Sequence, residues 1–213
     1  FNLRVRNNYM KIKTMHLHKL EYLQIGVFLY LAVALIKGSW AGDFWEHAAI
    51  VKQFSHSYTD NHPLLDVKKP HAFYSPYLFV LGFIVKYTGL SVIRTLTIAG
   101  FINLISLLYV FPKFIISIFH NKEIAFYSLL FTLFFWYSPY SYSGFLSINV
   151  LNYVLPYPST FAIILTLMLF VVYQSNKIRE KYLVLLVIVT SSIIIIVHPL
   201  TGIVNCLALF SIR

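Results

Sequence analysis

The stretch SVIRTLTIAGFINLISLLYVF, residues 91–111, decides the fold. Arg94, near its start, is the only charged residue in it, and a membrane span needs about 20 mainly apolar residues. Runs of the same kind recur at about 20–35, 124–140, 157–174 and 182–197, and a further run begins at Leu200. Because only helices and closed barrels can cross a bilayer, runs of this length predict an all-α polytopic membrane protein.

The composition of the whole chain agrees with this prediction. Of its 213 residues, 59% are hydrophobic and 11% are charged, whereas a soluble domain has roughly 25% charged residues. This excludes a soluble globular protein, and the abundance of Phe, Ile, Leu and Tyr excludes disorder. The net charge of +10 does not indicate a nucleic-acid partner, because the 17 Lys and Arg residues are spread between apolar runs. The single cysteine, Cys206, excludes a disulfide framework and a cysteine metal site.

The distribution of Lys and Arg predicts the orientation. The segment Pro76–Val85 is short for a crossing, so we expect an interfacial or re-entrant helix there. With the N-terminus in the cytoplasm, segments 1–19, 113–122 and 175–181 are cytoplasmic and carry basic residues, and the outer loops 141–156 and 198–200 carry none. If Pro76–Val85 crossed, the triplet Lys177, Arg179 and Lys181 would lie outside.

This topology divides the chain into two parts. Residues 1–19 are predicted to form a cytoplasmic tail, and residues 20–213 a transmembrane domain whose first external loop covers 38–90. We expect the domain to be truncated at Arg213, because the run from Leu200 is shorter than a span.

The first external loop carries the strongest candidate for chemistry. If a helix starts near Gly42, then Asp43, Glu46 and His47 fall at positions i, i+3 and i+4 and project from one face. Two carboxylates and an imidazole can act as general base or bind a divalent metal ion. The alternative is that Asp43 caps the helix and that Glu46 and His47 are ordinary surface groups.

A second candidate segment follows in the same loop. In Lys69-Pro70-His71-Ala72-Phe73-Tyr74-Ser75-Pro76 the prolines favour extended backbone before them. We assign Lys69, as a point charge for a phosphate, together with His71 and Tyr74 to substrate binding. The alternative for Lys69 is a lysine that reaches towards lipid headgroups.

Two further candidates lie at the outer ends of predicted spans. Arg94 could clamp a phosphate in bidentate fashion, or anchor the span at the interface. His198, before Pro199, could line the site or have a structural role only.

The order of these parts resembles the N-terminal half of the GT-C superfamily of polytopic glycosyltransferases, which includes aminoarabinose transferases, protein O-mannosyltransferases and oligosaccharyltransferases. Asp43 matches the acid after the first span, Lys69-Pro70 the Lys-Pro before a juxtamembrane helix, and Arg94 the arginine that enters the second span. The resemblance covers about residues 20–120. It implies a GT-C-like bundle with juxtamembrane helices and a polyprenyl-phosphate-linked sugar as donor. It also implies an extracytoplasmic site in which the acid is base or ligand and basic residues bind the phosphate.

The sequence thus predicts an integral membrane glycosyltransferase that moves a sugar from a polyprenyl phosphate or diphosphate to an extracytoplasmic acceptor. Its partners are the donor and the lipid bilayer, and the candidate cofactor is a divalent metal ion bound by Asp43, Glu46 and His47. The first alternative is a multi-span transporter or flippase of a lipid-linked or small polar substrate, and the second is a non-catalytic membrane scaffold.

Overall fold

A computed structural model describes residues 2–38, 40–56, 62–65, 67–69, 71–135, 146–175 and 178–211, with the backbone alone for residues 2–18. The regular elements of these residues are helices: α1 (Asn2–Lys37), α2 (Phe44–His56), α3 (Pro76–Thr88), α4 (Val92–Phe119), α5 (Lys122–Leu130), the π-helix η1 (Phe131–Phe135), α6 (Ile148–Val154), α7 (Pro158–Gln174), α8 (Glu180–Val197) and α9 (Pro199–Ser211). Pro70, Lys177, Arg213 and segment 136–145, on which some predictions fall, lie outside the described residues.

Within the described residues, three helical segments are long and apolar enough to cross a membrane: Lys19–Lys37, Val92–Phe119 and Glu180–Val197. Helices α6 and α7 pass the same test together, but they are bent by 114° at the break between them. Exposed apolar side chains such as Leu29, Ile105 and Ile188 cover the outer faces of α1, α4 and α8, as expected where lipid surrounds a protein. The chain is therefore a helical protein with the features of a multi-pass membrane protein.

Two of the predicted spans differ from the structure. The described part of 124–140 is α5 followed by η1, and it is not among the candidate spans. The predicted fourth span at 157–174 is α7, which becomes long enough only when it is joined to α6 across the bend. A plain count of apolar residues cannot reveal such a bend, because the residues on both sides of it are equally apolar.

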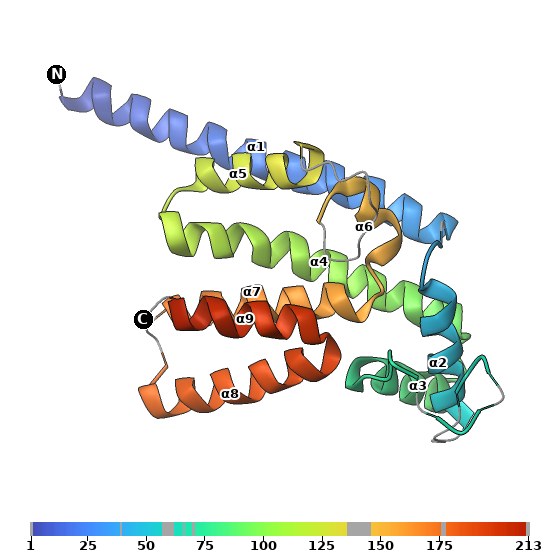
Figure 1. Cartoon of the computed structure of the whole chain (residues 1–213). Coiled ribbons are helices and arrows are strands. Elements are labelled where there is room, and N and C mark those ends of the chain that lie inside the picture. The colour runs from blue at the N-terminus through green and yellow to red at the C-terminus, as the bar shows by residue number, and fades with distance from the viewer. Residues whose placement is uncertain are drawn as a thin grey trace.

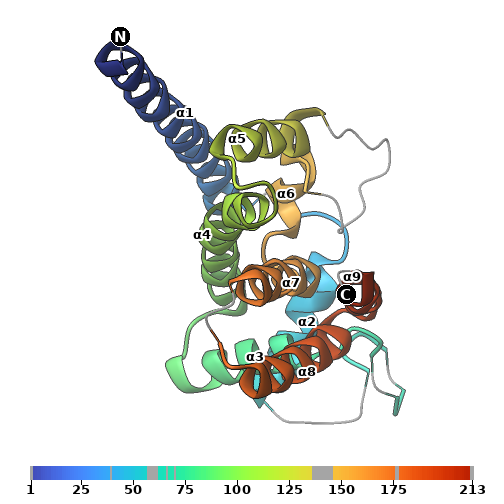
Figure 2. The ribbon, with the colours of Figure 1, turned by 90° about the vertical axis from the view of Figure 1, so that its left-hand side faces the viewer.

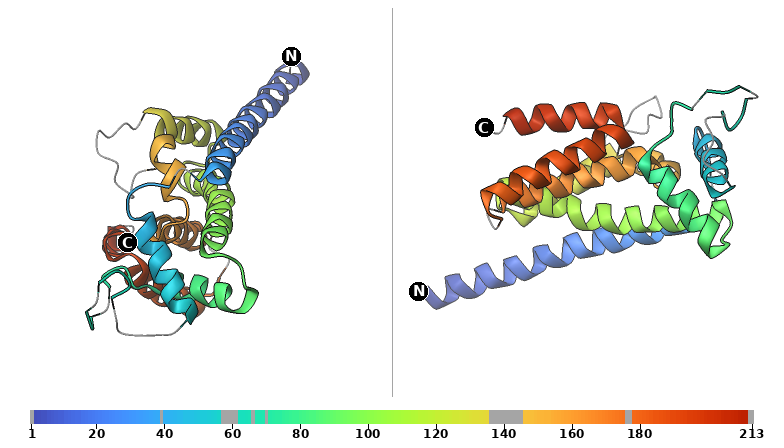
Figure 3. Two further views of the ribbon diagram at one scale, coloured as in Figure 1. Left: turned by 90° about the vertical axis from the view of Figure 1, so that its right-hand side faces the viewer. Right: turned by 90° about the horizontal axis from the view of Figure 1, so that it is seen from below.

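The long helices lie alongside one another and α2 and α3 lie across one end of them (Figure 1). The end-on view shows α1, α4, α5, α7, α8 and α9 side by side (Figure 2). The end of α4, the start of α5, the end of α7 and the start of α8 lie at the opposite end, as do the start of α1 and the end of α9 (Figures 1 and 3). Helix α3 has 13 residues and is about 20 Å long, short of a bilayer core of about 30 Å. Its position and length agree with the prediction that Pro76–Val85 does not cross.

Local signals in the sequence fix the ends of α3 and α4. Ser75 caps α3 by accepting a hydrogen bond from the Leu78 N–H, with Pro76 at the first helical position. Gly89 ends α3 in the left-handed conformation (φ 69°), which costs glycine nothing. Ser91 then caps α4 through the Arg94 N–H, so the chain turns sharply from α3 into the span.

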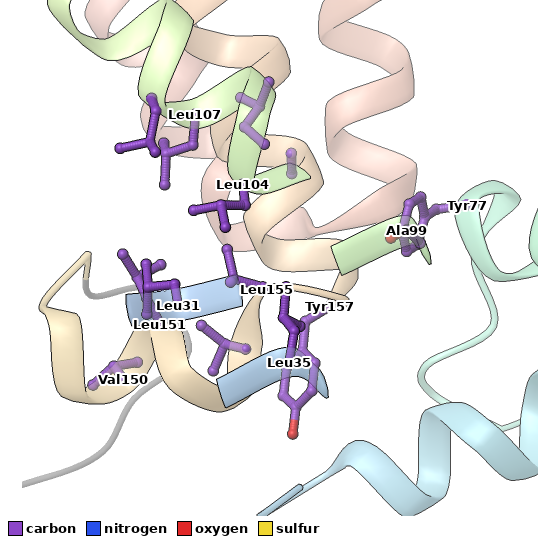
Figure 4. Packing of buried hydrophobic residues seen from close by; sticks show 14 of the residues in the cluster. Leu31, Leu35, Tyr77, Ala99, Leu104, Leu107, Val150, Leu151, Leu155 and Tyr157 are labelled. Atoms are coloured by element: carbon purple, nitrogen blue, oxygen red, sulfur yellow. The ribbon is translucent and has the colours of Figure 1, made fainter. Parts of the chain in front are cut away.

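The centre of the core lies between α1, α4 and α6. Leu31 and Leu35 of α1 pack with Leu104 of α4 and Leu151 of α6, and all four are at most 1% exposed (Figure 4). Gly100 permits this approach: a Cβ there would lie 2.8 Å from Leu35 Cδ2. Replacing such a leucine by alanine would leave a cavity, at a cost of about 2–5 kcal/mol.

The break between α6 and α7 exposes backbone carbonyls that buried side chains satisfy. Asn103 of α4 donates to the Leu155 carbonyl (2.8 Å), and the Tyr77 hydroxyl of α3 donates to the Pro156 carbonyl (3.1 Å). Asn103 also donates to the Tyr77 hydroxyl (3.2 Å), and Thr160 donates to the Val154 carbonyl (2.7 Å). Non-helical backbone at membrane depth is tolerated only when its polar groups are paired in this way. This network therefore keeps the break stable and joins α3, α4 and α7.

We predict that Asn103→Leu lowers the free energy of unfolding by about 1–3 kcal/mol. Leucine has nearly the same size as asparagine but leaves the Leu155 carbonyl without its donor. Thermal unfolding in detergent measures the loss, with Asn149→Leu on the exposed side of α6 as control. Equal unfolding temperatures for the two variants would contradict the role of the network.

We predict that Lys122→Cys and Ile178→Cys are labelled by an impermeant thiol reagent from one side of the membrane and Leu64→Cys from the other, in a Cys206→Ser background. The first two positions lie at one end of the bundle and Leu64 belongs to the loop at the other. The Lys and Arg distribution predicts that the Leu64 side is extracytoplasmic. Labelling of positions 122 and 178 from opposite sides would contradict the arrangement of α4, α5, α7 and α8.

Candidate functional site

A cavity of about 370 Å³ opens at the end of the bundle that carries α2 and α3. Four separate parts of the chain form its wall: the start of α2, the segment before α3, the start of α7 and the junction of α8 and α9. The lining residues are Asp43, His47, Ala72, Phe73, Tyr74, Tyr157, Pro158, Ser159, Ile196, Val197, His198, Pro199 and Leu200. The structure thus brings together four of the predicted site residues: Asp43, His47, Tyr74 and His198.

The start of α2 presents Asp43 to this cavity. Trp40 stacks on Phe44 with ring centroids 4.2 Å apart, and Gly42 takes a positive φ of 60°. The Asp43 carbonyl accepts the His47 N–H at 3.0 Å, so the helix begins directly after Asp43. The predicted i and i+4 neighbours, Asp43 and His47, therefore both line the cavity, and the Asp43 side chain is exposed.

Tyr157, at the bend between α6 and α7, ties the start of α2 to the bundle. Its hydroxyl donates to the Ala41 carbonyl at 2.5 Å. Its ring contacts the His47 ring edge to face, with centroids 4.7 Å apart. Tyr157 is only 3% exposed. Its contacts with Ala41 and His47 therefore join the start of α2 to the start of α7 within the protein interior.

His47 is a buried, neutral imidazole. It is 5% exposed and lies between Tyr157 and Phe73, whose ring centroid is 5.2 Å away. Burial, together with the nearby His71 and His198, lowers the pKa of His47 from 6.5 to about 4. Its Nδ1 has no hydrogen-bond partner. A neutral imidazole donates a hydrogen bond from one ring nitrogen and accepts one at the other.

Glu46 pairs with His71 and does not line the cavity. The Phe73 N–H donates to His71 Nδ1 at 3.1 Å, which leaves the proton of the neutral ring on Nε2. That nitrogen lies 3.3 Å from Glu46 Oε2. Burial and the neighbouring His62 lower the pKa of His71, although Glu46 opposes them. This contact between the imidazole and the carboxylate joins the segment before α3 to α2.

His198 reaches the cavity from the end of α8. The Thr201 N–H donates to His198 Nδ1 at 3.3 Å, and the Thr201 hydroxyl lies 2.7 Å from the same nitrogen. The proton of the neutral ring is therefore on Nε2. Burial lowers the pKa of His198, so this ring is neutral at pH 7 and can donate a hydrogen bond to a bound ligand.

Two further polar side chains lie in the cavity wall. Ser159, in the first turn of α7, is 3% exposed and its hydroxyl has no hydrogen-bond partner. Tyr74 donates its hydroxyl to Gln53 Oε1 at 2.8 Å, which anchors the cavity wall on α2. The start of α7 also directs its helix dipole, positive at this end, into the cavity.

The structure does not bring Lys69 and Arg94 to this cavity. Both are exposed and neither contributes to its wall. Lys69 lies two residues before His71, at the α2 start, whereas Arg94 follows the far end of α3, a helix about 20 Å long. Neither of the two cations that we expected to bind phosphate therefore lies at the cavity.

The predicted metal ligands are also divided. In the described part of the chain no group of three or more His, Cys, Asp or Glu residues is placed to bind a metal ion. Asp43 and His47 line the cavity, but Glu46 bonds to His71. We therefore derive the chemistry of the site from its carboxylate and imidazoles alone.

Comparison of the chain with protein-family models, with curated proteins and with solved structures gives no match. Function is therefore inferred from the residues of the cavity.

Sequence reasoning missed Phe73, Tyr157 and Ser159 as site residues. A signal was present in Pro156 and Pro158, which flank Tyr157 and prevent a regular helix through it. The sequence did not reveal where this bend lies relative to α2, because that depends on packing between segments more than 100 residues apart.

We predict that the stability of the protein rises with pH between about 4 and 6.5, in part because of His47. The unfolded chain binds a proton at His47 below pH 6.5, whereas the folded protein does not until about pH 4. Stability is thus complete above 6.5 and decreases as the pH falls, by roughly 3 kcal/mol at most. Unfolding in detergent at pH 7 and pH 4.5 measures the change, and His47→Asn should reduce this dependence. An equal pH dependence in the variant would rule out His47 as its source.

Proposed function

We propose that the chain is a membrane-embedded glycosyltransferase of the GT-C type, which moves a sugar from a polyprenyl phosphate or diphosphate to an acceptor on the extracytoplasmic side. One observation supports this most strongly: the Asp43 carboxylate lies in a cavity with His47 and His198 at one end of an apolar helical bundle. A lipid-linked donor needs such a place, because its chain belongs in the bilayer and its sugar at the interface.

In the proposed reaction Asp43 acts as the general base. The acceptor hydroxyl oxygen attacks the sugar C1 and forms the new glycosidic bond while the bond from C1 to the phosphate oxygen breaks. The electron pair of that bond leaves with the phosphate, and the acceptor proton passes to the Asp43 carboxylate. Asp43 is suited to this role because its side chain is exposed directly before α2 and lines the cavity.

The imidazoles and the start of α7 assist the same reaction. His198 carries its proton on Nε2 and can donate it as a hydrogen bond to the leaving phosphate or to the sugar. The helix dipole of α7 favours negative charge at Ser159, where charge develops as the phosphate leaves. The contact between Glu46 and His71 keeps the cavity wall in position.

We predict that Asp43→Asn lowers the rate of sugar transfer by about two orders of magnitude or more. Asparagine keeps the shape and can still cap α2, but it cannot accept the acceptor proton. Transfer from polyprenyl-phosphate sugar by the purified protein in detergent measures the rate, per folded molecule.

Glu123→Gln is the matched control, since Glu123 is an exposed acid in the first turn of α5 at the opposite end of the bundle. It should leave transfer unchanged. Wild-type transfer by Asp43→Asn would remove the proposed base, and Asp43 would then be a helix cap only.

The broken helix α6–α7 favours a second candidate, a transporter or flippase. Transporters bind substrates where half-helix N-termini meet near the membrane midplane. The N-terminus of α7 contributes to the cavity wall and Asn103 lies buried within α4, but the cavity lies at one end of the bundle. Movement of a lipid-linked sugar across the vesicle membrane, without any change in its covalent structure, would favour the transporter. The appearance of a glycosylated acceptor would favour the transferase.

A further inference from the structure

A second, basic groove lies at the other end of α2. It has a volume of about 380 Å³ and is lined by Lys52, Ser55 and His56 of α2, Val85 and Lys86 of α3, and Gly89, Leu90, Ser91 and Val92 at the start of α4. None of these residues lines the cavity around Asp43. Along α2, the distance from His47 to His56 is about 14 Å, so the groove is a separate site.

Close packing of α2 on α3 brings these cations together. A Cβ at Gly82 would lie 2.5 Å from Phe54 Cβ and 3.1 Å from the Val51 carbonyl oxygen. Only glycine allows this approach. Lys52 stands two residues before Phe54 and Lys86 one helical turn after Gly82, so the contact at Gly82 aligns the two lysines along one groove.

The groove carries an excess of positive charge. Among the residues that the structure describes, no carboxylate forms an ion pair with Lys52 or Lys86. The C-terminal ends of α2 and α3 each contribute about −0.5 charge, and the N-terminal end of α4 about +0.5. Together with the two lysine ammonium groups, these partial charges give the groove a net charge of about +1.5, with His56 left out. The helix ends therefore do not balance the lysines, so the groove favours an anion.

The groove also lies beside the start of a candidate membrane span. The candidate span Val92–Phe119 begins at its wall. The outer face of α3 is apolar and exposed, at Phe79, Val80, Phe83, Ile84 and Tyr87. A helix with an exposed apolar face beside a span lies in the interface, with that face towards the acyl chains. At this depth the anions available to two lysines are lipid phosphates.

We propose that this groove binds the phosphate of an anionic membrane lipid, with Lys52 and Lys86 as its ligands and the start of α4 adding a partial positive charge. Leu90 and Val92 in the groove and the outer face of α3 provide apolar surface for the acyl chains. This proposal does not depend on the chemistry of the Asp43 cavity. It would fix the depth and tilt of α2 and thereby the position of that cavity at the membrane surface.

The experiment uses the purified chain in detergent, titrated with phosphatidylglycerol or phosphatidylcholine while native mass spectrometry counts bound lipid. We expect the wild type to prefer phosphatidylglycerol by about tenfold or more. The double variant Lys52→Gln/Lys86→Gln should lose this preference, and Lys52→Arg/Lys86→Arg should keep it. The control Lys113→Gln/Lys122→Gln changes the net charge equally at the opposite end of the bundle and should also keep it.

An unchanged preference in the Lys52→Gln/Lys86→Gln variant, or an equal loss in the control, would overturn the proposal. Inorganic phosphate is the second probe. If it displaces phosphatidylglycerol as well as further phosphatidylglycerol does, the groove binds free phosphate and the lipid assignment is wrong. If it does not, the acyl chains contribute to binding, as the apolar wall requires.

Discussion

The bend between α6 and α7 is the feature on which the rest of the structure depends. A helix that bends by 114° leaves backbone carbonyls without their helical partners, and within a membrane no water replaces them. Asn103, Tyr77 and Thr160 supply the missing donors. Each comes from a different helix, so pairing these carbonyls also fixes α3, α4 and α7 relative to one another.

The bend in turn creates the cavity. It turns Tyr157 towards the start of α2, where its hydroxyl bonds to the Ala41 carbonyl and its ring covers His47. Burial under this ring keeps His47 neutral, with a pKa of about 4. The same bend places Ser159 and the positive end of α7 opposite Asp43. A carboxylate, neutral imidazoles and a helix N-terminus thus meet in one space because one helix is interrupted.

Helix α2 links two sites of opposite character. Its N-terminal end presents Asp43 and His47 to the cavity, and its C-terminal half presents Lys52 and His56 to the basic groove. The close packing at Gly82 and the contact between His71 and Glu46 attach α3 and its preceding segment to α2. A ligand in the groove would therefore act on the cavity through a short, rigid helix.

The sequence alone determined the helical class, the apolar runs that became α1, α4 and α8, and the caps at Ser75, Gly89 and Ser91, because hydropathy and capping are local properties. It also placed Asp43 and His47 on one helical face, since that follows from helical spacing. Only the tertiary structure decided that Glu46 contacts His71, that Lys69 and Arg94 do not line the cavity, and that Lys52 and Lys86 line one groove. These outcomes depend on packing between segments that are separated in the chain, and local sequence patterns do not encode such packing.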